Sequence, residues 1–292
     1  MALSGGLDSA ILAFCIQKKK IKAFSVIAEN FTSSDLLFAQ LAAKTNDLNL
    51  EVLHVGIDQL LLAVEETIKI LHVFNPIEIR NNVVMYLVLK NAKTRHCKEM
   101  ITGDGADELF AGYNFFKKMT IKDLEQDLKR IWKIMHFPSK LIADSLGMSL
   151  CTPFLDKNVA EFAKKISADM KVKEENGVKF GKWVLRKAFE NDLPRSIVWR
   201  EKAAMQDGSG TSGLTSFLEN TIGQTEFEEK AKKYQKEEKV RLSKESLFYY
   251  ELFRKYNLPP YELNDMPIRC PVCDFGMSEK SHFCRMCGSF PI

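Results

Sequence analysis

A glycine-containing loop near the start of the chain constrains the fold more than any other feature. Residues 4–9 read SGGLDS and separate the short apolar segment Met1–Leu3 from the apolar run Ala10–Ile16. Glycines let a backbone turn sharply and approach a ligand closely, and the amide groups at a helix N-terminus attract anions. A short strand, this loop and a buried helix therefore predict an α/β protein with a phosphate site.

The polar side chains of the loop indicate which phosphate chemistry it suits. Ser4 and Ser9 offer hydroxyl donors to phosphate oxygens, whereas the Asp8 carboxylate repels phosphate unless a cation lies between them. Mg²⁺ binds carboxylate and phosphate oxygens together and resolves that conflict. No Gly-Lys-Ser or Gly-Lys-Thr follows, so the loop is not a Walker motif. The alternative interpretation is a capped helix start in which Asp8 or Ser9 is the N-cap residue.

Short strand patterns alternate with helical patterns through the first hundred residues. The predicted strands are Lys22–Ala28, Leu50–Val55 and Glu99–Thr102. The predicted helices between them are Ser34–Asn46, Asp58–His72 and Arg80–Lys93. This order predicts βαβ units and a mainly parallel sheet flanked by helices. From about Thr120 the helical period dominates, and the charged stretch Phe217–Tyr256 predicts one or two further helices.

A second loop rich in glycine and aspartate follows the third predicted strand. Gly103 and Gly105 permit a close backbone approach, and Asp104 and Asp107 add carboxylates. Open α/β sheets bind ligands at the carboxyl ends of their strands, which is where both loops are expected. The pattern therefore predicts a Mg²⁺ site formed together with Asp8, with an ordinary surface turn as the alternative.

The composition indicates a globular protein. Of the 292 residues, 46% are hydrophobic and 27% charged, and the net charge is only +4. No apolar run approaches the ~20 residues of a membrane span. The loop follows Met1 almost at once, so we expect no signal peptide and a cytoplasmic protein. The basic stretch Lys117–Lys140 is interpreted as a solvated helix face.

Four of the seven cysteines crowd into the end of the chain. They form two C-x₂-C pairs with ten residues between them: Cys270, Cys273, Cys284 and Cys287. Two such pairs place four thiolates around Zn²⁺, and a closed site of this kind is structural. A redox-active dithiol is the alternative.

Four segments in order along residues 1–215 resemble the synthetase domain of asparagine synthetase, within the PP-loop family of N-type ATP pyrophosphatases. They are residues 4–9 (SGGLDS), residues 101–113 (ITGDGADELFAGY), residues 152–156 (TPFLD), and residues 181–202, which contain GKWVLR, LP and WREK. The resemblance implies a ligase that adenylates a carboxylate, with aspartate as the expected acceptor, and releases pyrophosphate. Ammonia then attacks the acyl-adenylate and forms the amide.

The resemblance also implies a role for each matching residue. ATP is expected to contact Ser4, Gly5, Gly6, Asp8, Ser9, Ile27, Thr102 and Gly103. Asp8 and Asp107 are expected to bind magnesium pyrophosphate. Lys202 is expected to stabilise charge on the phosphate, and Asp104 is our candidate acceptor for the proton of the attacking amine.

Three departures from the family pattern leave the acceptor open. Asp104 stands where the family usually has glutamate, Ser149 replaces a glutamate and Cys151 replaces an arginine. Family members also carry a glutaminase domain that begins with a nucleophilic cysteine; we expect this chain to lack it and to use free ammonia or a separate glutaminase subunit. The alternatives are adenylation of another acceptor such as a tRNA base, and a nucleotide-binding regulatory protein. The cysteine module is only weakly basic, which gives RNA no support as its partner.

The predicted organisation has three parts. Residues 1–215 are expected to form the ATP pyrophosphatase domain, residues 216–265 a helical extension and linker, and residues 266–292 a zinc ribbon. The break at Leu258-Pro259-Pro260 precedes the ribbon.

Overall fold

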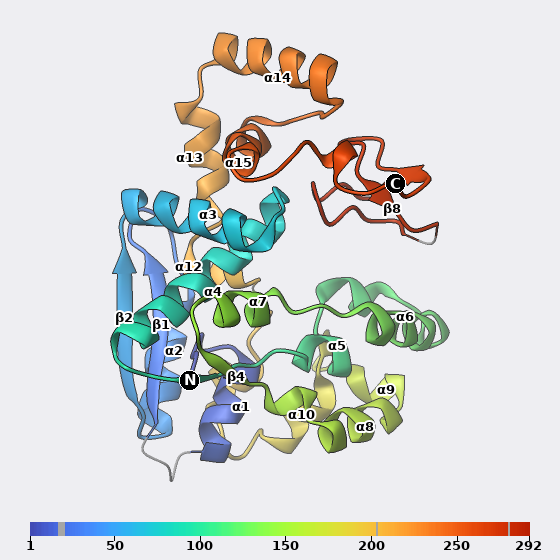
Figure 1. The fold of residues 1–292 in the computed structure, drawn as a ribbon. Coiled ribbons are helices and arrows are strands. Elements are labelled where there is room, and N and C mark those ends of the chain that lie inside the picture. Colours follow the sequence, from blue (N-terminus) through green and yellow to red (C-terminus); the bar gives the residue numbers. More distant parts are fainter. Residues whose placement is uncertain (17–20, 203, 280) are drawn as a thin grey trace. The chain divides into compact units, whose positions relative to one another are not determined.

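The chain folds into two compact units, which are described separately. The computed structural model describes residues 1–16, 21–202, 204–279 and 281–292 (Figure 1). The first unit contains residues 1–27, 33–54 and 88–209, and the second contains residues 28–32, 55–87 and 210–292. The domain boundaries expected after residues 215 and 265 stay a prediction.

Short strands form the centre of the first unit. Their bounds are β1 (Lys22–Ala28), β2 (Asn49–Val55), β3 (Glu99–Ile101) and β4 (Ser149–Cys151). β1 pairs with β2, and their arrows run in the same direction in Figure 1. β3 and β4 are parallel, with Ile101 opposite Cys151. This pairing confirms the predicted mixed α/β class with parallel strands.

The N-terminal segment joins the two strand pairs. The Ala2 amide donates a 2.9 Å hydrogen bond to the Ile101 carbonyl, and the Leu3 amide donates one of 2.9 Å to the Phe24 carbonyl. The segment also forms a parallel bridge between Ala2 and Phe24. The loop at residues 4–9 therefore follows a segment that is hydrogen-bonded both to β1 and to the end of β3.

Helices cover the strands of the first unit. They are α1 (Leu7–Ile16), α2 (Asp35–Thr45), α5 (Ala106–Phe110), α6 (Ile121–Ile134), α7 (Pro138–Ser145), α8 (Lys157–Lys165), α9 (Ala168–Lys171), α10 (Trp183–Ala188), α11 (Arg195–Val198) and α12 (Met205–Ser209). α1 is buried along most of its length and packs with α2 and α11. Its core residues Leu7 and Ile11 join a cluster with Leu109 and Phe110 of α5, which fixes the two loops beside each other.

A hairpin in the first unit differs from the helical expectation. β5 (Val172–Glu175) and β6 (Val178–Gly181) pair antiparallel, although helices were expected from about Thr120 onward. Asn176 and Gly177 form the turn with φ values of +52° and +79°. Asn-Gly is the strongest short signal for such a turn, so the sequence contained evidence of the hairpin that the helical period outweighed.

The second unit is mainly helical. It contains α3 (Ile57–Leu71), residues 76–87 of α4 (Pro76–Thr94), α13 (Gly213–Thr221), α14 (Gln224–Glu238) and α15 (Lys244–Arg254). Three helices thus lie in or extend into Phe217–Tyr256, where one or two were expected. Gly223 precedes α14, and a Ser243 capping box begins α15, so local sequence signals end and restart the helix there.

The second unit also contains the cysteine module. Its strands β7 (Ile268–Arg269) and β8 (Gly276–Met277) pair antiparallel. The module is attached to the helices by the Phe74 amide, which donates a 3.0 Å hydrogen bond to the Met286 carbonyl. Within the part of the chain that the structure describes, no helix is both long and apolar enough to cross a membrane.

Candidate functional site

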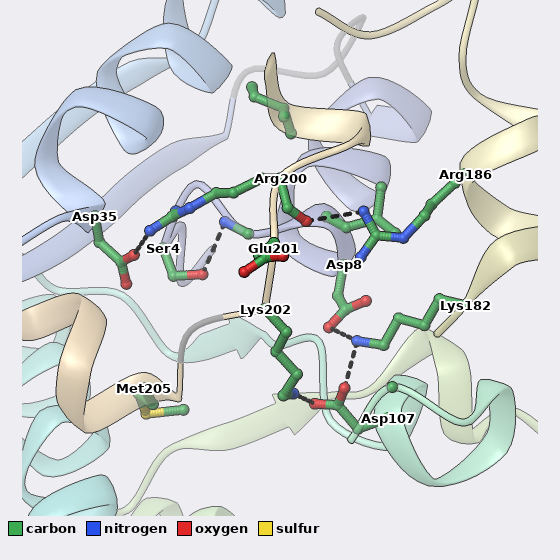
Figure 2. Close-up of a pocket in the computed structure, with 14 residues that line it drawn as sticks. Ser4, Asp8, Asp35, Asp107, Lys182, Arg186, Arg200, Glu201, Lys202 and Met205 are labelled. Carbon is green, nitrogen blue, oxygen red and sulfur yellow. Dashed lines mark hydrogen bonds and ion pairs between the residues drawn. The ribbon is translucent and has the colours of Figure 1, made fainter. Parts of the chain in front are cut away.

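A pocket in the first unit collects charged side chains from several elements. Figure 2 shows side chains from α1, α2, the end of β6 and the segment after α11 around it. Its lining consists of Ser4, Gly6, Leu7, Asp8, Asp35, Asp107, Gly112, Lys182, Arg186, Ile197, Arg200, Glu201, Lys202 and Met205. The predicted residues Ser4, Gly6, Asp8, Asp107 and Lys202 are thus brought together.

The loop at residues 4–9 has a conformation that needs glycine. Gly5 has a φ of +74°, and a side chain there would clash with the backbone of α2. The Gly6 amide donates to Ser4 Oγ at 3.3 Å, and Ser9 Oγ donates to the Gly6 carbonyl at 3.1 Å. The two serine hydroxyls lie 3.3 Å apart. α1 begins directly after this turn, so its N-terminal end lies beside the pocket.

Four charged groups form the centre of the site. Lys182 Nζ lies 2.5 Å from Asp8 Oδ2 and 2.6 Å from Asp107 Oδ1. Lys202 forms an ion pair with the other oxygen of Asp107. Figure 2 shows the Lys182 ammonium group between the two carboxylates. We call Asp8, Asp107, Lys182 and Lys202 the carboxylate–lysine cluster.

Glycines allow the cluster to assemble from distant segments. Lys182 follows β6, and its amide donates a 3.0 Å hydrogen bond to the Phe110 carbonyl at the end of α5. A Cβ atom at Gly112 would clash with the Asp107 carboxylate and the Lys182 side chain. Lys182 itself has a φ of +56°, in the left-handed region that favours glycine. This backbone conformation accompanies the placement of the ammonium group between Asp8 and Asp107.

The charges of the cluster stabilise one another. Burial alone would raise the pKa of Asp107, but the ammonium groups of Lys182 and Lys202 hold that pKa well below its usual range. Burial likewise works to lower the pKa of Lys182, and the carboxylates of Asp107 and Asp8 outweigh it and raise that pKa. Both shifts favour the charged forms of Asp107 and Lys182 near neutral pH.

Arg186 forms hydrogen bonds with the backbone of the segment that carries Lys202. It lies on α10, is 5% exposed, and donates hydrogen bonds to the carbonyls of Gly181 at 2.9 Å and Arg200 at 3.0 Å. A further bond goes to the Val198 carbonyl. Burial lowers the pKa of Arg186 to about 10, which leaves it charged near neutral pH. The side chain thus positions the backbone just before Lys202.

Arg200 forms the opposite side of the pocket. Its guanidinium lies 2.9 Å from Asp35 Oδ1 and 3.9 Å from the centre of the Phe38 ring. It also donates to Ser34 Oγ at 2.9 Å. The Ser34 side chain does not cap α2. Burial is the main cause that raises the pKa of the Asp35 carboxyl, against the opposing effect of Arg200.

Other predicted residues are not among the described residues that line the pocket. Gly5 and Ser9 belong to the same loop, and a Cβ atom at Gly103 would lie 3.1 Å from the Asp8 Cβ. Ile27 is buried in β1, and Thr102 is buried after β3. Their roles stay predictions.

The described hydrogen bonds of Asp104 involve residues outside the carboxylate–lysine cluster. Its Oδ2 accepts hydrogen bonds from Thr102 Oγ1 at 2.9 Å and Ser139 Oγ at 2.6 Å. Burial raises the pKa of its carboxyl. It is not among the described residues that line the pocket. Its role as proton acceptor stays a prediction.

The sequence reasoning assigned no role to Lys182, Arg186, Arg200 or Asp35. The first two lie in the GKWVLR segment and Arg200 lies in WREK, so their presence in the family pattern was the available signal. Asp35 carried no signal, because only the fold brings it beside Arg200.

The four C-terminal cysteines form a second candidate site. All four sulfur atoms lie within 4.8 Å of one another, and Cys270, Cys273 and Cys284 are buried. The Cys270 and Cys287 sulfurs are 3.7 Å apart, as are those of Cys273 and Cys284. Tetrahedral zinc with Zn–S bonds of about 2.3 Å requires a sulfur separation of about 3.8 Å. The thiolate set therefore fits a metal ion of this size.

An anion-attracting loop and a carboxylate–lysine cluster at the ends of parallel strands define the class: an α/β protein with a site suited to phosphate groups. Comparison with known proteins agrees with this class. The chain belongs to the asparagine synthase family, which matches residues 1–143 and 141–257. The family inferred from the sequence segments is therefore confirmed. The four cysteines lie beyond the matched residues.

Individual relatives cover most of the chain. A glutamine-hydrolysing asparagine synthetase from Gallus gallus is 31% identical over 277 residues, which covers 87% of this chain and 48% of the relative. Asparagine synthetase 2 of Oryza sativa subsp. japonica is 28% identical, with 87% and 46% covered. Asparagine synthetase B of Escherichia coli K12 is 28% identical, with 87% and 49% covered. The chain spans about half the length of the curated relatives it matches.

Proposed function

We propose that this chain is an ATP-dependent amide-forming ligase that adenylates a carboxylate, releases pyrophosphate and transfers the acyl group to ammonia. One observation carries the proposal: the pocket joins the glycine loop of residues 4–9 to the carboxylate–lysine cluster. Backbone amides and serine hydroxyls suit phosphate oxygens, and lysines suit the charge that develops on a departing pyrophosphate. Membership of the asparagine synthase family supports the same reaction.

Mg²⁺ fits the carboxylates of the cluster. Asp8 Oδ1 is buried and accepts no hydrogen bond from the residues described, so it has a free coordination position. Asp107 lies on the other side of the Lys182 ammonium group. Asp8 and Asp107 would hold the ion, which neutralises phosphate charge when bound.

The other pocket residues would orient the reactants. Lys202 Nζ lies 5.0 Å from the centre of the Tyr113 ring, and Tyr113 donates a 2.5 Å hydrogen bond to Glu108. These contacts and the Asp107 ion pair hold the Lys202 ammonium group where it would stabilise the phosphate. For ATP binding we retain the residues expected from the sequence, Ser4, Gly5, Gly6, Asp8, Ser9, Ile27, Thr102 and Gly103. Asp104 remains the candidate proton acceptor.

The acceptor is proposed to be aspartate, and one strand bears on that choice. Ser149 and Cys151 lie on β4, directly beside β3, and the Thr102 amide donates a 3.0 Å hydrogen bond to the Cys151 carbonyl. Two departures from the family pattern therefore lie beside the strand that leads to Thr102 and Asp104. Ammonia is proposed to come from solution or from a separate glutaminase subunit.

The deciding experiment measures pyrophosphate release from Mg²⁺-ATP with aspartate and ammonium added or omitted. Release that requires aspartate, with asparagine and AMP as products, would establish the proposal. Asp107→Asn is the inactive comparison, and Glu161→Gln on the exposed face of α8 is the matched control. Release that requires tRNA and not aspartate would identify a different acceptor. ATP binding without release under every condition would indicate a regulatory protein.

A variant tests the acceptor directly. The combination Ser149→Glu with Cys151→Arg restores the two charged residues of the family pattern on β4. If aspartate is a poor acceptor for the natural sequence, this variant should lower the KM for aspartate. An unchanged KM would show that β4 does not contact the acceptor.

We also propose that Cys270, Cys273, Cys284 and Cys287 hold a structural zinc ion. The sulfur separations of 3.7 Å support this. A closed set of four thiolates leaves no open position for catalysis. Metal analysis of the purified protein should find one zinc per chain.

A further inference from the structure

We propose that Lys182 occupies the divalent-cation position of the nucleotide-free protein, so that the metal ion enters only together with phosphate. This inference rests on the proposed function for one point, the assignment of Asp8 and Asp107 as the metal ligands. It assigns to Lys182 a role as an internal counter-ion that couples metal binding to nucleotide binding.

The Lys182 ammonium group forms ion pairs with both carboxylates at once. Lys182 Nζ is 2.5 Å from Asp8 Oδ2 and 2.6 Å from Asp107 Oδ1, and it comes from neither of the elements that carry the carboxylates. Figure 2 shows it between the two acids. A metal ion that bridged Asp8 and Asp107 would have to displace this group or lie against it.

The charges oppose a divalent ion while the lysine is present. Counted as formal charges, Asp8 and Asp107 contribute −2 and their ion-pair partners Lys182 and Lys202 contribute +2, so the four groups balance one another without a metal ion. Lys182 is only 4% exposed, and a like charge brought close to a buried ammonium group is strongly repelled in this weakly polar environment. Free Mg²⁺ should therefore bind poorly.

Phosphate changes this balance. The cluster borders the loop of residues 4–9, and an ATP phosphate there supplies new negative charge close to both lysines. An ammonium group that turns to a phosphate oxygen frees oxygens of Asp8 and Asp107, in addition to the unpaired Asp8 Oδ1. The carboxylate oxygens of Asp8 and Asp107 then become available to the ion at the same time as the phosphate oxygens.

The fixed backbone of Lys182 limits this movement to the side chain. Its amide is fixed to the Phe110 carbonyl at 3.0 Å, and its side chain packs against Gly112. The terminal part of the side chain can rotate while the backbone remains in place. A change in the position of one ammonium group, without a loop movement, is sufficient to couple metal binding to nucleotide binding.

The test is a titration with Mn²⁺, followed by electron paramagnetic resonance, of the full chain without nucleotide. The variants are Lys182→Met, which keeps the side-chain volume, Asp107→Asn, and the double variant. Lys179→Met, at an exposed lysine of β6, is the matched control. We expect Lys182→Met to bind Mn²⁺ at least about tenfold more tightly than the natural protein, a difference of about 1.4 kcal/mol. The double variant should lose this gain.

Two results would overturn the inference. The first is equal Mn²⁺ affinity in the natural protein and in Lys182→Met. The second result does not need Lys182→Met, in case that variant does not fold. It is a tenfold higher affinity for Mn²⁺ in the natural protein than in Asp107→Asn. Such a difference would show that the lysine does not exclude the ion. As a second readout, Mn²⁺ should raise the melting temperature of Lys182→Met and leave that of Lys179→Met unchanged.

These outcomes are independent of turnover. If the natural protein releases no pyrophosphate with any acceptor, the proposed function fails, and the Mn²⁺ titrations still decide the role of Lys182. If it releases pyrophosphate and the titrations show equal affinities, only the inference about Lys182 fails.

Discussion

Replacing Arg186 by methionine should damage both the stability of the first unit and its proposed reaction. The guanidinium is 5% exposed and donates to three backbone carbonyls, those of Gly181, Val198 and Arg200. Methionine keeps much of the volume and supplies no donor. Three backbone carbonyls would then lose the hydrogen bond from the guanidinium, and the segment before Lys202 would lose its attachment to α10.

The expected loss of stability follows from these bonds. A hydrogen bond to a charged group contributes about 1.5–3 kcal/mol. The burial cost of the charge, visible in the lowered pKa of Arg186, offsets part of the sum. We therefore expect the unfolding free energy to fall by about 3–4 kcal/mol, a large fraction of the 5–15 kcal/mol typical of a folded domain.

Urea unfolding, followed by circular dichroism and by tryptophan fluorescence, measures this loss. Arg195→Met, at an exposed arginine of α11, should change the unfolding free energy by less than about 0.5 kcal/mol. Pyrophosphate release by Arg186→Met should fall even at low temperature, where the variant is folded. A loss below about 1 kcal/mol would refute the reasoning, because one ordinary hydrogen bond would account for it.

Three further predictions concern other parts of the molecule. Gly112→Ala should abolish pyrophosphate release, because the added Cβ would clash with the Asp107 carboxylate, and retained activity would show that the cluster tolerates displacement. Lys171 is buried, and burial lowers its pKa from 10.5 to about 8. Between these two pH values the unfolded chain binds more protons than the folded chain. The unfolding free energy should therefore rise with pH across that range. A pKa shift of this size corresponds to a rise of at most about 3 kcal/mol, less where solvent screens the charge. Lys171→Met should remove the rise in urea titrations, and a persisting rise would assign it to another group. Cys273→Ser should release zinc, measured with a chromogenic chelator, and should lower the melting temperature of the second unit. ATP binding should persist, because the pocket contains only residues of the first unit. Loss of ATP binding in this variant would contradict the prediction.

The local elements of the fold were largely predictable. β1 has the predicted bounds Lys22–Ala28, because an apolar run of this length between polar residues has few alternatives. The hairpin of β5 and β6 was missed, since its charged residues weaken the strand pattern and only Asn176-Gly177 indicates it. The number of helices after Phe217 was underestimated for a related reason: the breaks at Gly223 and Ser243 are short local signals within a charged stretch.

The sequence by itself determined the parts of the site that are contiguous. The loop of residues 4–9, the Gly-Asp segment after β3 and the paired cysteines are short motifs, and glycine or cysteine at those spacings has few structural uses. Composition and order were sufficient to identify the α/β class and the family.

Only the tertiary structure decided which charges meet. Asp8 and Lys182 are 174 residues apart, and their contact depends on the left-handed backbone at Lys182 and on the absence of a side chain at Gly112. Asp104 was expected at the site from its place in the sequence, yet its carboxylate accepts hydrogen bonds from Ser139 and Thr102 and is not among the described residues that line the pocket. Side-chain direction and the pairing of distant charges depend on packing between segments, and no local pattern of residues encodes that packing.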